Sequence, residues 1–545
     1  MKNPKILVII PARGGSKGIP RKNLRSLNGK PLIYYSIKNA LSVETYAIDC
    51  YVSSEDDEIL AISNKFNAKI FRRDSQNSVD KTTLDPVIHE AYEAIKVIEK
   101  KDYDIVITLQ PTSPLLSPKS IENAIDTLLE KELDTIISGT WDSHLSWIKK
   151  EGKFLPNYKK RLNRQELPEI YRETGGFLIT RTEFVQPNSR LGGSIEIFPL
   201  KQKEAIDIDN YEDWSLCEYY LKRKRIVFAV SGNREIGLGH VYNTLSIANE
   251  ILNHEIIFLV DKTSELAFTK IKELNHNVHI QQSKNTFTES ILEFRPDVVI
   301  NDRLDTTEGE ILALKNHGCL VINFEDLGSG SRKADLVINA MYPEENFMLG
   351  HFFGTKYFIL RDEFIFTPVK TVINKVRTLL ISFGGVDPNN YTARVLKIVK
   401  PICDELKIKI VVIAGMGYKN MEDLLAIYND VKILKNVSSI SEQMSTADVV
   451  FTSAGRTTFE VAAIGVPTIV LCQNERETTH FFASEENGFY NLGLGSEVSD
   501  ADIKAAFEKT LPLETRLAMN QRMLESSLRN GKKRVMKLIN GLINE

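Results

Sequence analysis

A glycine-rich, cationic segment follows the first apolar run of the chain. Its sequence is Pro11-Ala12-Arg13-Gly14-Gly15-Ser16-Lys17-Gly18-Ile19-Pro20-Arg21-Lys22-Asn23. Glycines let a backbone pass close to phosphate oxygens, and four cations within ten residues favour an anion. The segment fits neither the P-loop nor the G-x-G-x-x-G pattern. Taken alone, it is equally consistent with a phosphate-binding loop and with a basic surface turn.

Two aspartates in the segment Ala-Ile-Asp-Ile-Asp are the second candidate site. Asp207 and Asp209 are two residues apart, so on an extended backbone both carboxylates point to one face. Mg²⁺ prefers oxygen ligands and usually keeps waters and substrate phosphates in its coordination shell, so two carboxylates suit it. By themselves, the two aspartates could equally cap the helix that follows.

A histidine at the start of a predicted helix is the third candidate. His240 follows Gly239 in Gly-Leu-Gly-His, where it can titrate near neutral pH in a cleft, although a lone histidine at a turn is more often structural. A second glycine turn, at Gly384 and Gly385, complements it later in the chain.

The segment 453–460 opens a predicted helix with small residues, a pattern that binds pyrophosphate at a helix N-terminus. It contains Ser453, Gly455 and Thr457, and one turn in comes Glu460, which can accept hydrogen bonds from ribose hydroxyls. The alternatives are a simple capping turn with Thr457 as the N-cap, and a Glu460 exposed on an ordinary helix.

The composition is that of a globular protein with several domains. The chain has 545 residues, of which 42% are hydrophobic and 26% charged, and its net charge is −3. These values exclude disordered, collagenous and small disulfide-stapled proteins. No global positive field exists to hold nucleic acid or an anionic membrane, so we expect neither as a partner.

Five widely spaced cysteines, an odd number without a C-x-x-C pair, indicate reduced, buried thiols and no zinc site. They are Cys50, Cys217, Cys319, Cys403 and Cys472. The first apolar run is too short for a signal peptide, and no run approaches the roughly 18–20 residues that span a bilayer. We therefore expect a cytoplasmic protein.

Short apolar, β-branched runs alternate with helical patterns along the first 220 residues or so. The predicted strands are Ile6–Ile10, Ile48–Ser53, Ile105–Leu109 and Thr135–Ser138, and the predicted helices are Leu32–Leu41, Glu55–Phe66 and Asp85–Glu99. Apolar runs buried on both faces are typical of parallel sheets. The pattern predicts a doubly wound α/β domain over residues 1–222, ending at a basic run.

Two further α/β series, over 223–370 and 371–545, predict two Rossmann-type halves. Their predicted elements include the strands Ile226–Val230, Val298–Asn301, Thr378–Phe383 and Asp448–Thr452, and the helices Val241–Leu252, Tyr391–Val399 and Thr457–Ile464. The residues beyond 500 are expected to form helices that close the last lobe.

Four segments of the first domain resemble, in the same order, those of the acylneuraminate (sialic-acid) cytidylyltransferases. They are ARGGSKGIPRKN at 12–23, LQPTSPL at 109–115, RQELPEIYRETGGF at 164–177 and AIDIDNYEDW at 205–214. Such enzymes transfer CMP from CTP to a nine-carbon 2-keto sugar acid and release pyrophosphate. The resemblance implies a nucleotide-diphospho-sugar transferase-like fold, Mg²⁺ as cofactor, and in-line attack by the sugar's anomeric hydroxyl on the α-phosphorus.

The same resemblance implies roles for individual residues. CTP would be bound by Arg13, Ser16, Lys17, Asn23 and Arg72, with Arg73 as the adjacent alternative; the sugar acid by Gln110, Arg164 and Arg172; and Mg²⁺ by Asp207 and Asp209, while Lys22 and Asp209 take part in catalysis. An arginine suits the carboxylate of the sugar acid because its planar fork binds two oxygens.

The C-terminal part resembles the UDP-sugar hydrolase of pseudaminic acid synthesis, a two-lobed enzyme of the GT-B type. The matching segments are IGLGH at 236–240, ISFGGVDPNN at 381–390, FTSAGRTTFEVAAIGVP at 451–467 and QNERETTHF at 473–481. The resemblance implies that His240 orients or activates a water at the anomeric carbon. It also implies a UDP-sugar site formed by Gly239, Gly384, Gly385, Ser453, Gly455, Thr457, Glu460 and Asn474.

Three positions depart from that second family. Ala229 and Ser231 stand where it usually has an arginine and an aspartate, and Asn243 stands where it usually has an arginine. Three interpretations therefore stay open: a hydrolase that releases UDP, a non-catalytic module that binds a sugar nucleotide, and a glycosyltransferase.

The segment 140–175 resembles the part through which relatives of the first family dimerise, so we expect a homodimer. The identity of the nine-carbon acid stays open among neuraminic, legionaminic and pseudaminic acids.

Overall fold

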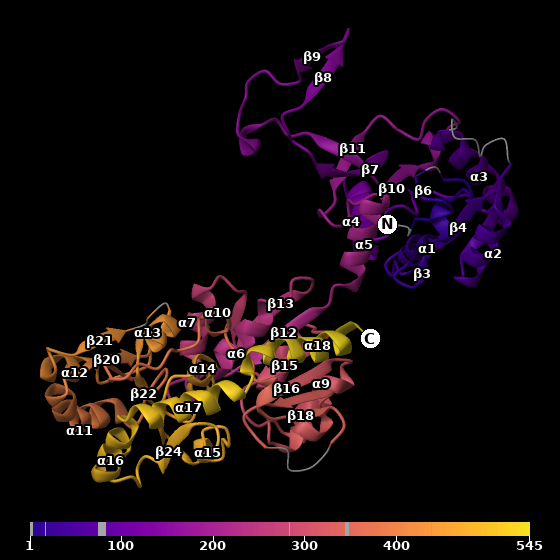
Figure 1. The fold of residues 1–545 in the computed structure, drawn as a ribbon. Coiled ribbons are helices and arrows are strands. Elements are labelled where there is room, and N and C mark those ends of the chain that lie inside the picture. Colours follow the sequence, from indigo (N-terminus) through magenta and orange to yellow (C-terminus); the bar gives the residue numbers. More distant parts are fainter. Residues whose placement is uncertain are drawn as a thin grey trace. The chain divides into compact units, whose positions relative to one another are not determined.

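The computed structural model describes residues 4–16, 18–74, 83–282, 284–343, 348–435, 437 and 439–544. The chain divides into two compact units, Met1–Arg223 and Lys224–Glu545. Figure 1 shows the first unit in indigo to magenta and the second in magenta to yellow.

A seven-stranded mixed sheet with the order β11-β7-β10-β6-β1-β4-β5 forms the centre of the first unit. Its strands are β1 (Ile6–Pro11), β4 (Ile48–Ser54), β5 (Lys69–Arg72), β6 (Ile105–Leu109), β7 (Thr135–Trp141), β10 (Tyr171–Arg181) and β11 (Ile195–Pro199). The predicted α/β sheet is confirmed, with one difference. Strand β10 runs antiparallel to both β6 and β7, because it enters the sheet from the long excursion after β7.

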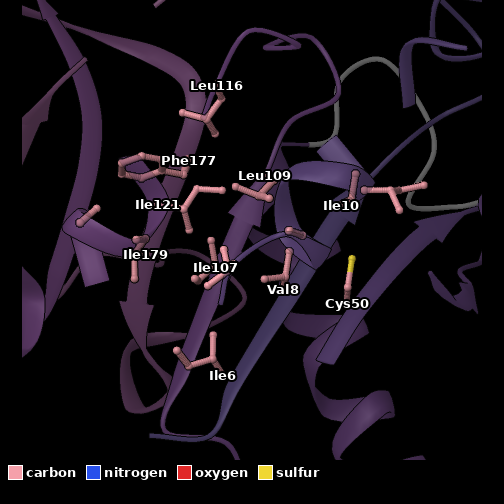
Figure 2. Close-up of a cluster of buried hydrophobic side chains, with 14 of the residues drawn as sticks. Ile6, Val8, Ile10, Cys50, Ile107, Leu109, Leu116, Ile121, Phe177 and Ile179 are labelled. Carbon is pink, nitrogen blue, oxygen red and sulfur yellow. The ribbon is translucent and has the colours of Figure 1, made fainter. Parts of the chain in front are cut away.

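Helices cover both faces of this sheet. They are α1 (Leu32–Leu41), α2 (Asp57–Lys65), α3 (Leu84–Glu99), α4 (Pro118–Glu130) and α5 (Tyr211–Lys222). Along β1, Ile6, Val8 and Ile10 pack into the core on one face (Figure 2), whereas Leu7 and Ile9 pack into a second core with α3 on the other. Every residue of β1 is buried, which accounts for its unbroken apolar sequence.

A two-stranded hairpin extends from the excursion between β7 and β10. It comprises β8 (Trp147–Lys150) and β9 (Lys153–Pro156), whose residues are all exposed. Within the first unit, Figure 1 shows this hairpin standing away from the main sheet. Large apolar side chains such as Trp147 and Phe154, 55% and 67% exposed, lie on it.

The second unit contains two parallel sheets, so the predicted pair of Rossmann-type halves is confirmed. The first sheet contains β12 (Arg225–Val230), β13 (Glu255–Val260), β14 (Val278–Ile280), β15 (Val298–Asp302), β16 (Leu320–Phe324), β17 (Leu336–Asn339) and β18 (His351–Phe353). The second contains β19 (Thr378–Ile381), β20 (Lys409–Ala414), β21 (Lys432–Lys435), β22 (Val449–Thr452), β23 (Thr468–Cys472) and β24 (Phe489–Leu494). This is a two-lobed, GT-B-like arrangement.

Helices flank both sheets of the second unit. They are α6 (Gly239–Ala248), α7 (Glu265–Glu273), α8 (Phe287–Glu293), α9 (Glu308–Asn316), α10 (Asp362–Phe366), α11 (Tyr391–Glu405), α12 (Met421–Ile427), α13 (Ile440–Thr446), α14 (Thr457–Ile464), α15 (Glu475–Thr478), α16 (Asp500–Thr510), α17 (Leu513–Glu525) and α18 (Gly531–Asn544). Two differ clearly from expectation: α6 ends four residues before the predicted Leu252, and α11 continues past Val399 through an internal proline, Pro401.

The last helix corrects the expectation that the C-terminal helices all close the last lobe. Helix α18 packs Val535, Met536, Ile539 and Ile543 into the core of the first sheet of this unit. We call residues 224–353 together with α18 the first lobe, and residues 378–525 the second lobe. The segment between them contributes Phe358, whose ring stacks on Phe459 of the second lobe with centroids 3.8 Å apart.

All five cysteines are buried and free. Among the helices of the described residues, none is long and apolar enough to cross a membrane.

Candidate functional site

The glycine-rich segment leaves the carboxyl end of β1 and folds back onto residues 207–209. The side-chain amide of Asn23 closes the segment by donating to the carbonyl oxygen of Arg13 at 2.9 Å. The ammonium of Lys22 donates to the carbonyl oxygen of Ile208 at 2.6 Å and lies 3.9 Å from the Asp209 carboxylate. The structure thus joins the predicted phosphate loop to the predicted metal ligands. Lys17 lies outside the described residues.

Glycine is required at one point of this contact. A Cβ added to Gly18 would lie 2.5 Å from the carbonyl oxygen of Asp209, a distance that real Cβ atoms do not show. At Gly15, in the same loop, an added Cβ would meet nothing within 4 Å.

The two aspartates differ in their surroundings. Burial, together with the neighbouring Asp209 carboxylate, raises the pKa of Asp207. Oδ1 of Asp207 is buried without a hydrogen-bond partner among the described residues, whereas the side chain of Asp209 is 81% exposed. A buried carboxylate oxygen without a partner is costly, and a bound cation would satisfy it. Within the described part of the chain, no group of three or more His, Cys, Asp or Glu could hold a metal, so phosphate oxygens or waters would have to complete the shell.

An ion pair that the motifs did not predict contacts the backbone of the phosphate loop. Glu55 accepts the backbone N–H of Gly14 at 2.8 Å and two donors of Arg73 at 2.7 and 3.1 Å. Burial alone would raise the pKa of Glu55, but the Gly14 amide and Arg73 outweigh it and lower that pKa. Arg73 also donates to the carbonyl oxygen of Ala12. Arg72, which was predicted to bind CTP, instead points outwards and pairs with Asp57.

The predicted sugar-acid residues lie on different elements. Arg172, on β10, pairs with Asp142 at 3.2 Å, and the guanidinium of Arg164 lies over the ring of Trp141, 4.6 Å from its centroid. Both arginines therefore border the end of β7. Gln110 follows β6 directly, and its backbone oxygen accepts the hydroxyl of Ser36.

In the second unit, a cleft of about 530 Å³ lies between the two lobes. All eight residues predicted to bind a UDP-sugar line it: Gly239, Gly384, Gly385, Ser453, Gly455, Thr457, Glu460 and Asn474. The lobes come close here, since a Cβ on Gly239 of the first lobe would lie 3.1 Å from the Cδ of Arg456 in the second.

His240 is held by a carboxylate that the sequence motifs did not single out. Its Nδ1 lies 2.5 Å from Oδ1 of Asp302, and the side-chain amide of Asn243 donates to Oδ2 of the same carboxylate at 2.7 Å. Asp302 ends β15 and is fully buried, and the His240 side chain is 15% exposed. A carboxylate at Nδ1 sets the imidazole so that Nε2 can accept a proton.

Two of the three departures from the second family have partners in the structure. Asn243, in place of an arginine, binds Asp302 as described, and the hydroxyl of Ser231 donates to Asp261 at 2.6 Å. Ala229 is buried in the core on the far face of its sheet. These substitutions therefore leave a satisfied polar network beside the cleft.

The residues of the second lobe that line the cleft are also fixed by buried charges. Glu460 is buried and pairs with Arg361 at 2.8 Å, so it is not the exposed helix residue of the alternative interpretation. Thr457 begins α14, whose N-cap is Arg456, so the alternative of a Thr457 cap is also wrong. Burial raises the pKa of Glu477, whose carboxylate accepts the backbone N–H groups of Gln473 and Ala454 and thereby holds the turn at Ser453–Gly455.

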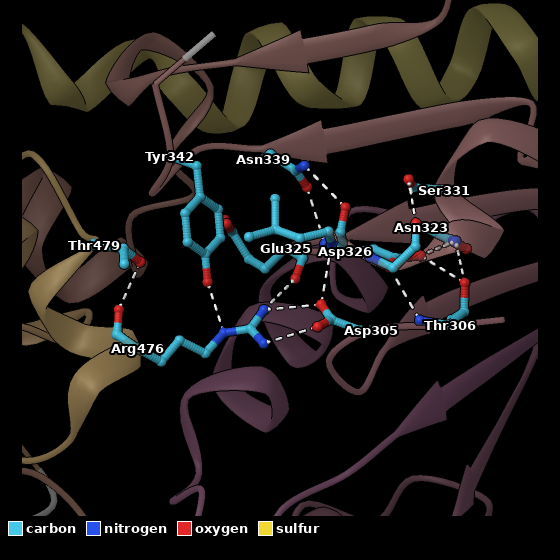
Figure 3. A network of polar contacts seen from close by, with 12 residues as sticks. Asp305, Thr306, Asn323, Glu325, Asp326, Ser331, Asn339, Tyr342, Arg476 and Thr479 are labelled. Carbon is cyan, nitrogen blue, oxygen red and sulfur yellow. Dashed lines mark hydrogen bonds and ion pairs between the residues drawn. The ribbon is translucent and has the colours of Figure 1, made fainter. Parts of the chain in front are cut away.

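One further buried carboxyl group lies beside Asp302. Glu325 follows β16, and its two oxygens accept the backbone N–H groups of Ala340 and Met341 at 3.1 and 3.3 Å. Burial, and secondly the Asp302 carboxylate, raises the pKa of Glu325 to about 8. Figure 3 shows it within a larger polar network at the ends of β15, β16 and β17.

Comparison with known proteins identifies the family to which the first unit is similar. The Cytidylyltransferase family matches residues 7–247, a range that runs past the first unit into α6. The pseudaminic acid cytidylyltransferase of Campylobacter jejuni subsp. jejuni serotype O:2 is 31% identical over 232 residues, which are 41% of this chain and 97% of that protein. The chain belongs to the cytidylyltransferase family.

Other similarities cover less of the proteins concerned. The "Uncharacterized protein MJ1062" of Methanocaldococcus jannaschii is 34% identical over 274 residues, 46% of this chain and 56% of that protein. The cytidylyltransferase chain thus spans little more than half of this relative. The crystal structure of MurG from Acinetobacter baumannii aligns with 58% of this chain and 99% of its own, at 16% identity and a TM-score of 0.42.

Gly18→Ala should separate the phosphate loop from the aspartates. The added Cβ collides with the Asp209 backbone, and a displacement of about 1 Å at a reacting centre can cost about 10²-fold in rate. Gly15→Ala, in the same loop but with open space around the new carbon, should lose much less. Pyrophosphate release from CTP measures both; equal losses would show that the close approach at Gly18 is unimportant.

Glu325→Gln should change how stability depends on pH. The folded pKa of about 8 lies above the ordinary 4.5, so between these values folding takes up a proton and stability falls as pH rises. Glutamine cannot titrate, so the melting temperature of the variant should rise relative to wild type from about pH 5 to about pH 8. Glu308→Gln, on the surface of α9, is the matched control. A pH-independent difference for Glu325→Gln would show that the buried carboxyl is ionised throughout.

Proposed function

We propose that the cytidylyltransferase unit transfers CMP from CTP to a nine-carbon 2-keto sugar acid and releases pyrophosphate. The observation that carries this proposal is the contact of the phosphate loop with residues 207–209 through Lys22 and Gly18. The reaction brings two anions together and expels a third, so its barrier is mainly electrostatic and positional. The similarity to a pseudaminic acid cytidylyltransferase supports a sugar acid of this class as the acceptor.

Each group of residues has a task in this reaction. Arg13, Ser16 and the Lys22 ammonium bind phosphate oxygens, while Asn23 keeps the loop closed. Arg164 and Arg172, which contact Trp141 and Asp142 at the end of β7, would bind the acceptor's carboxylate. Arg73 stabilises the loop through Glu55, whereas Arg72 pairs with Asp57 and we assign it no role in binding CTP.

Asp207 and Asp209 would hold Mg²⁺. The buried Oδ1 of Asp207, which has no hydrogen-bond partner among the described residues, fits this role because a bound cation would satisfy it. When bound, the ion neutralises charge on the phosphates of CTP. The exposed apolar side chains of the β8–β9 hairpin support our further proposal that two copies of the chain associate through this segment.

Asp207→Asn should abolish pyrophosphate release while preserving the fold, because it keeps the shape of the side chain but removes the buried charge. We expect a loss of about 10²-fold or more with CTP, Mg²⁺ and a panel of pseudaminic, legionaminic and neuraminic acids. The control is Asp102→Asn, a surface aspartate paired with Lys96. Full activity of Asp207→Asn, or activity without divalent cation, would refute the metal assignment; no release by wild type with any acid would refute the acceptor class.

For the second unit, we infer that the cleft hydrolyses a UDP-sugar. The observation that carries this inference is the His240–Asp302–Asn243 arrangement, which sets Nε2 of His240 to accept a proton. His240 would deprotonate a water that attacks the anomeric carbon, the bond from that carbon to UDP breaks, and UDP leaves with its electron pair. The residues of the second lobe around Glu460 and the Ser453–Gly455 turn would hold the nucleotide.

His240→Ala should abolish UDP release from a UDP-hexosamine panel without weakening UDP binding, since the imidazole acts only on water. A loss of about 10²–10⁴-fold is the usual contribution of a general base. His317→Ala, at a surface histidine of the same lobe, is the control. UDP binding without release in wild type would favour the non-catalytic module, and release only with an added acceptor would favour the glycosyltransferase.

A further inference from the structure

Arg476 crosses from the second lobe to the first and contacts three groups there. It lies on α15, and its guanidinium donates to both carboxylate oxygens of Asp305 at 3.1 and 3.2 Å. It also donates to the hydroxyl of Tyr342 at 2.8 Å and to the backbone oxygen of Glu325 at 3.1 Å. We call this set of contacts, visible in Figure 3, the Arg476 bridge.

The first-lobe side of the bridge is held by hydrogen bonds that do not involve the arginine. Asp326 is buried and accepts the Thr306 hydroxyl and the Asn323 amide, both at 2.6 Å, and the Gly328 N–H at 2.8 Å. The side chain of Asn339 accepts the backbone N–H of Asp326 and donates to the backbone oxygen of the same residue. A buried polar network with its partners in place holds one geometry.

Two residues at this surface have left-handed backbones although neither is glycine. Leu304 has φ 74° and Glu325 has φ 50°, and they lie beside the two groups, Asp305 and the Glu325 carbonyl, that the arginine contacts. Such conformations cost free energy and persist where the surroundings enforce them, commonly at functional sites. These two strained residues lie where the Asp305 carboxylate and the Glu325 carbonyl both contact the guanidinium of Arg476.

The second-lobe end of the bridge belongs to a segment that lines the cleft, and the first-lobe end follows the strand whose last residue holds His240. In the first lobe, Asp305 is three residues beyond Asp302, the carboxylate that holds His240. In the second lobe, Arg476 stands between Asn474, which lines the cleft, and Glu477, which holds the Ser453–Gly455 turn. We therefore expect a change in the bridge to alter the distance between His240 and the Ser453–Gly455 turn.

We propose that Arg476 is a positioning residue, which fixes the second lobe and its bound nucleotide against His240 when the cleft closes. The side chains of Arg476 and Asp305 are 33% and 46% exposed. Solvent weakens an ion pair so exposed, so the bridge can open to admit the substrate and re-form over it. The proposal rests on the proposed function of the cleft, and the outcomes given below distinguish a failure of the bridge from a failure of that function.

Interlobe distances test the bridge without a substrate. All five native cysteines are buried, so spin labels can be placed at Asn316→Cys on α9 and Ala505→Cys on α16, both exposed. In the full chain with saturating UDP, we expect a narrow distance distribution for wild type and a broader, longer one for Arg476→Ala. Asp305→Asn, which leaves the arginine in place, should give a similar change and serves if Arg476→Ala folds poorly.

Kinetics separate positioning from a general loss of structure. With the UDP-sugar that wild type hydrolyses, Arg476→Ala should lower kcat about tenfold or more and change KM and the Kd for UDP by less than about threefold. Arg476→Lys should recover part of the rate, because lysine keeps the positive charge but lacks the planar guanidinium that contacts both oxygens of Asp305. Arg522→Ala is the matched control, since that arginine donates to the carbonyl of Glu485 within the second lobe.

The outcomes are distinguishable. Unchanged distances in both Arg476→Ala and Asp305→Asn would overturn the bridge, whatever the activity. A lower UDP affinity with an unchanged kcat would also overturn it, because Arg476 would then act in binding. Changed distances in a protein that binds no UDP would retain the bridge and refute the proposed function of the cleft.

Discussion

Helices cover both faces of the sheets in this protein, and this burial leaves the carboxyl ends of the strands as the place where polar groups can gather. In the first unit, the phosphate loop follows β1 and Glu55 follows β4. In the second, Asp302 ends β15, Glu325 follows β16, and the turns at Gly384–Gly385 and Ser453–Gly455 follow β19 and β22. Parallel strands end at one edge, so residues far apart in sequence become neighbours there.

Charges at these edges are buried in pairs, and the pairs hold the loops. Glu55 and Arg73 support the phosphate loop, Arg361 fixes Glu460 beside the cleft, and Asp302 orients His240. Breaking a buried pair leaves an uncompensated charge, which is far costlier than losing an exposed pair. Preorganisation of this kind is what electrostatic catalysis requires, because the dipoles need not rearrange during the reaction.

The cleft of the second unit shows how a site can depart from a family pattern and remain coherent. Asn243 has no charge, yet its amide satisfies the second oxygen of Asp302. Ser231 likewise donates to Asp261. Neutral side chains at these two positions therefore donate to the carboxylates of Asp302 and Asp261. His240 keeps its contact with Asp302 despite these substitutions.

The sequence by itself determined the features that depend on local patterns. Apolar runs such as Ile6–Ile10 identified buried strands, and the resemblance of the C-terminal segments to a UDP-sugar hydrolase identified eight residues that line the cleft. Only the tertiary structure decided the direction of β10, because neighbouring strands share one apolar pattern whichever way they run. It also decided that α18 packs on the first lobe, since an amphipathic helix does not specify which core it covers.

The tertiary structure likewise revealed the partners of the predicted residues. Asp302, Glu325 and Arg476 belong to no motif, and their roles arise from contacts between positions dozens of residues or more apart. The different partners of Arg72 and Arg73 follow the same rule: adjacent strand-end residues point in opposite directions, and only Arg73, which faces the loop, pairs with the side chain of Glu55. Motifs report residue types at a spacing, whereas burial and pairing depend on the whole chain.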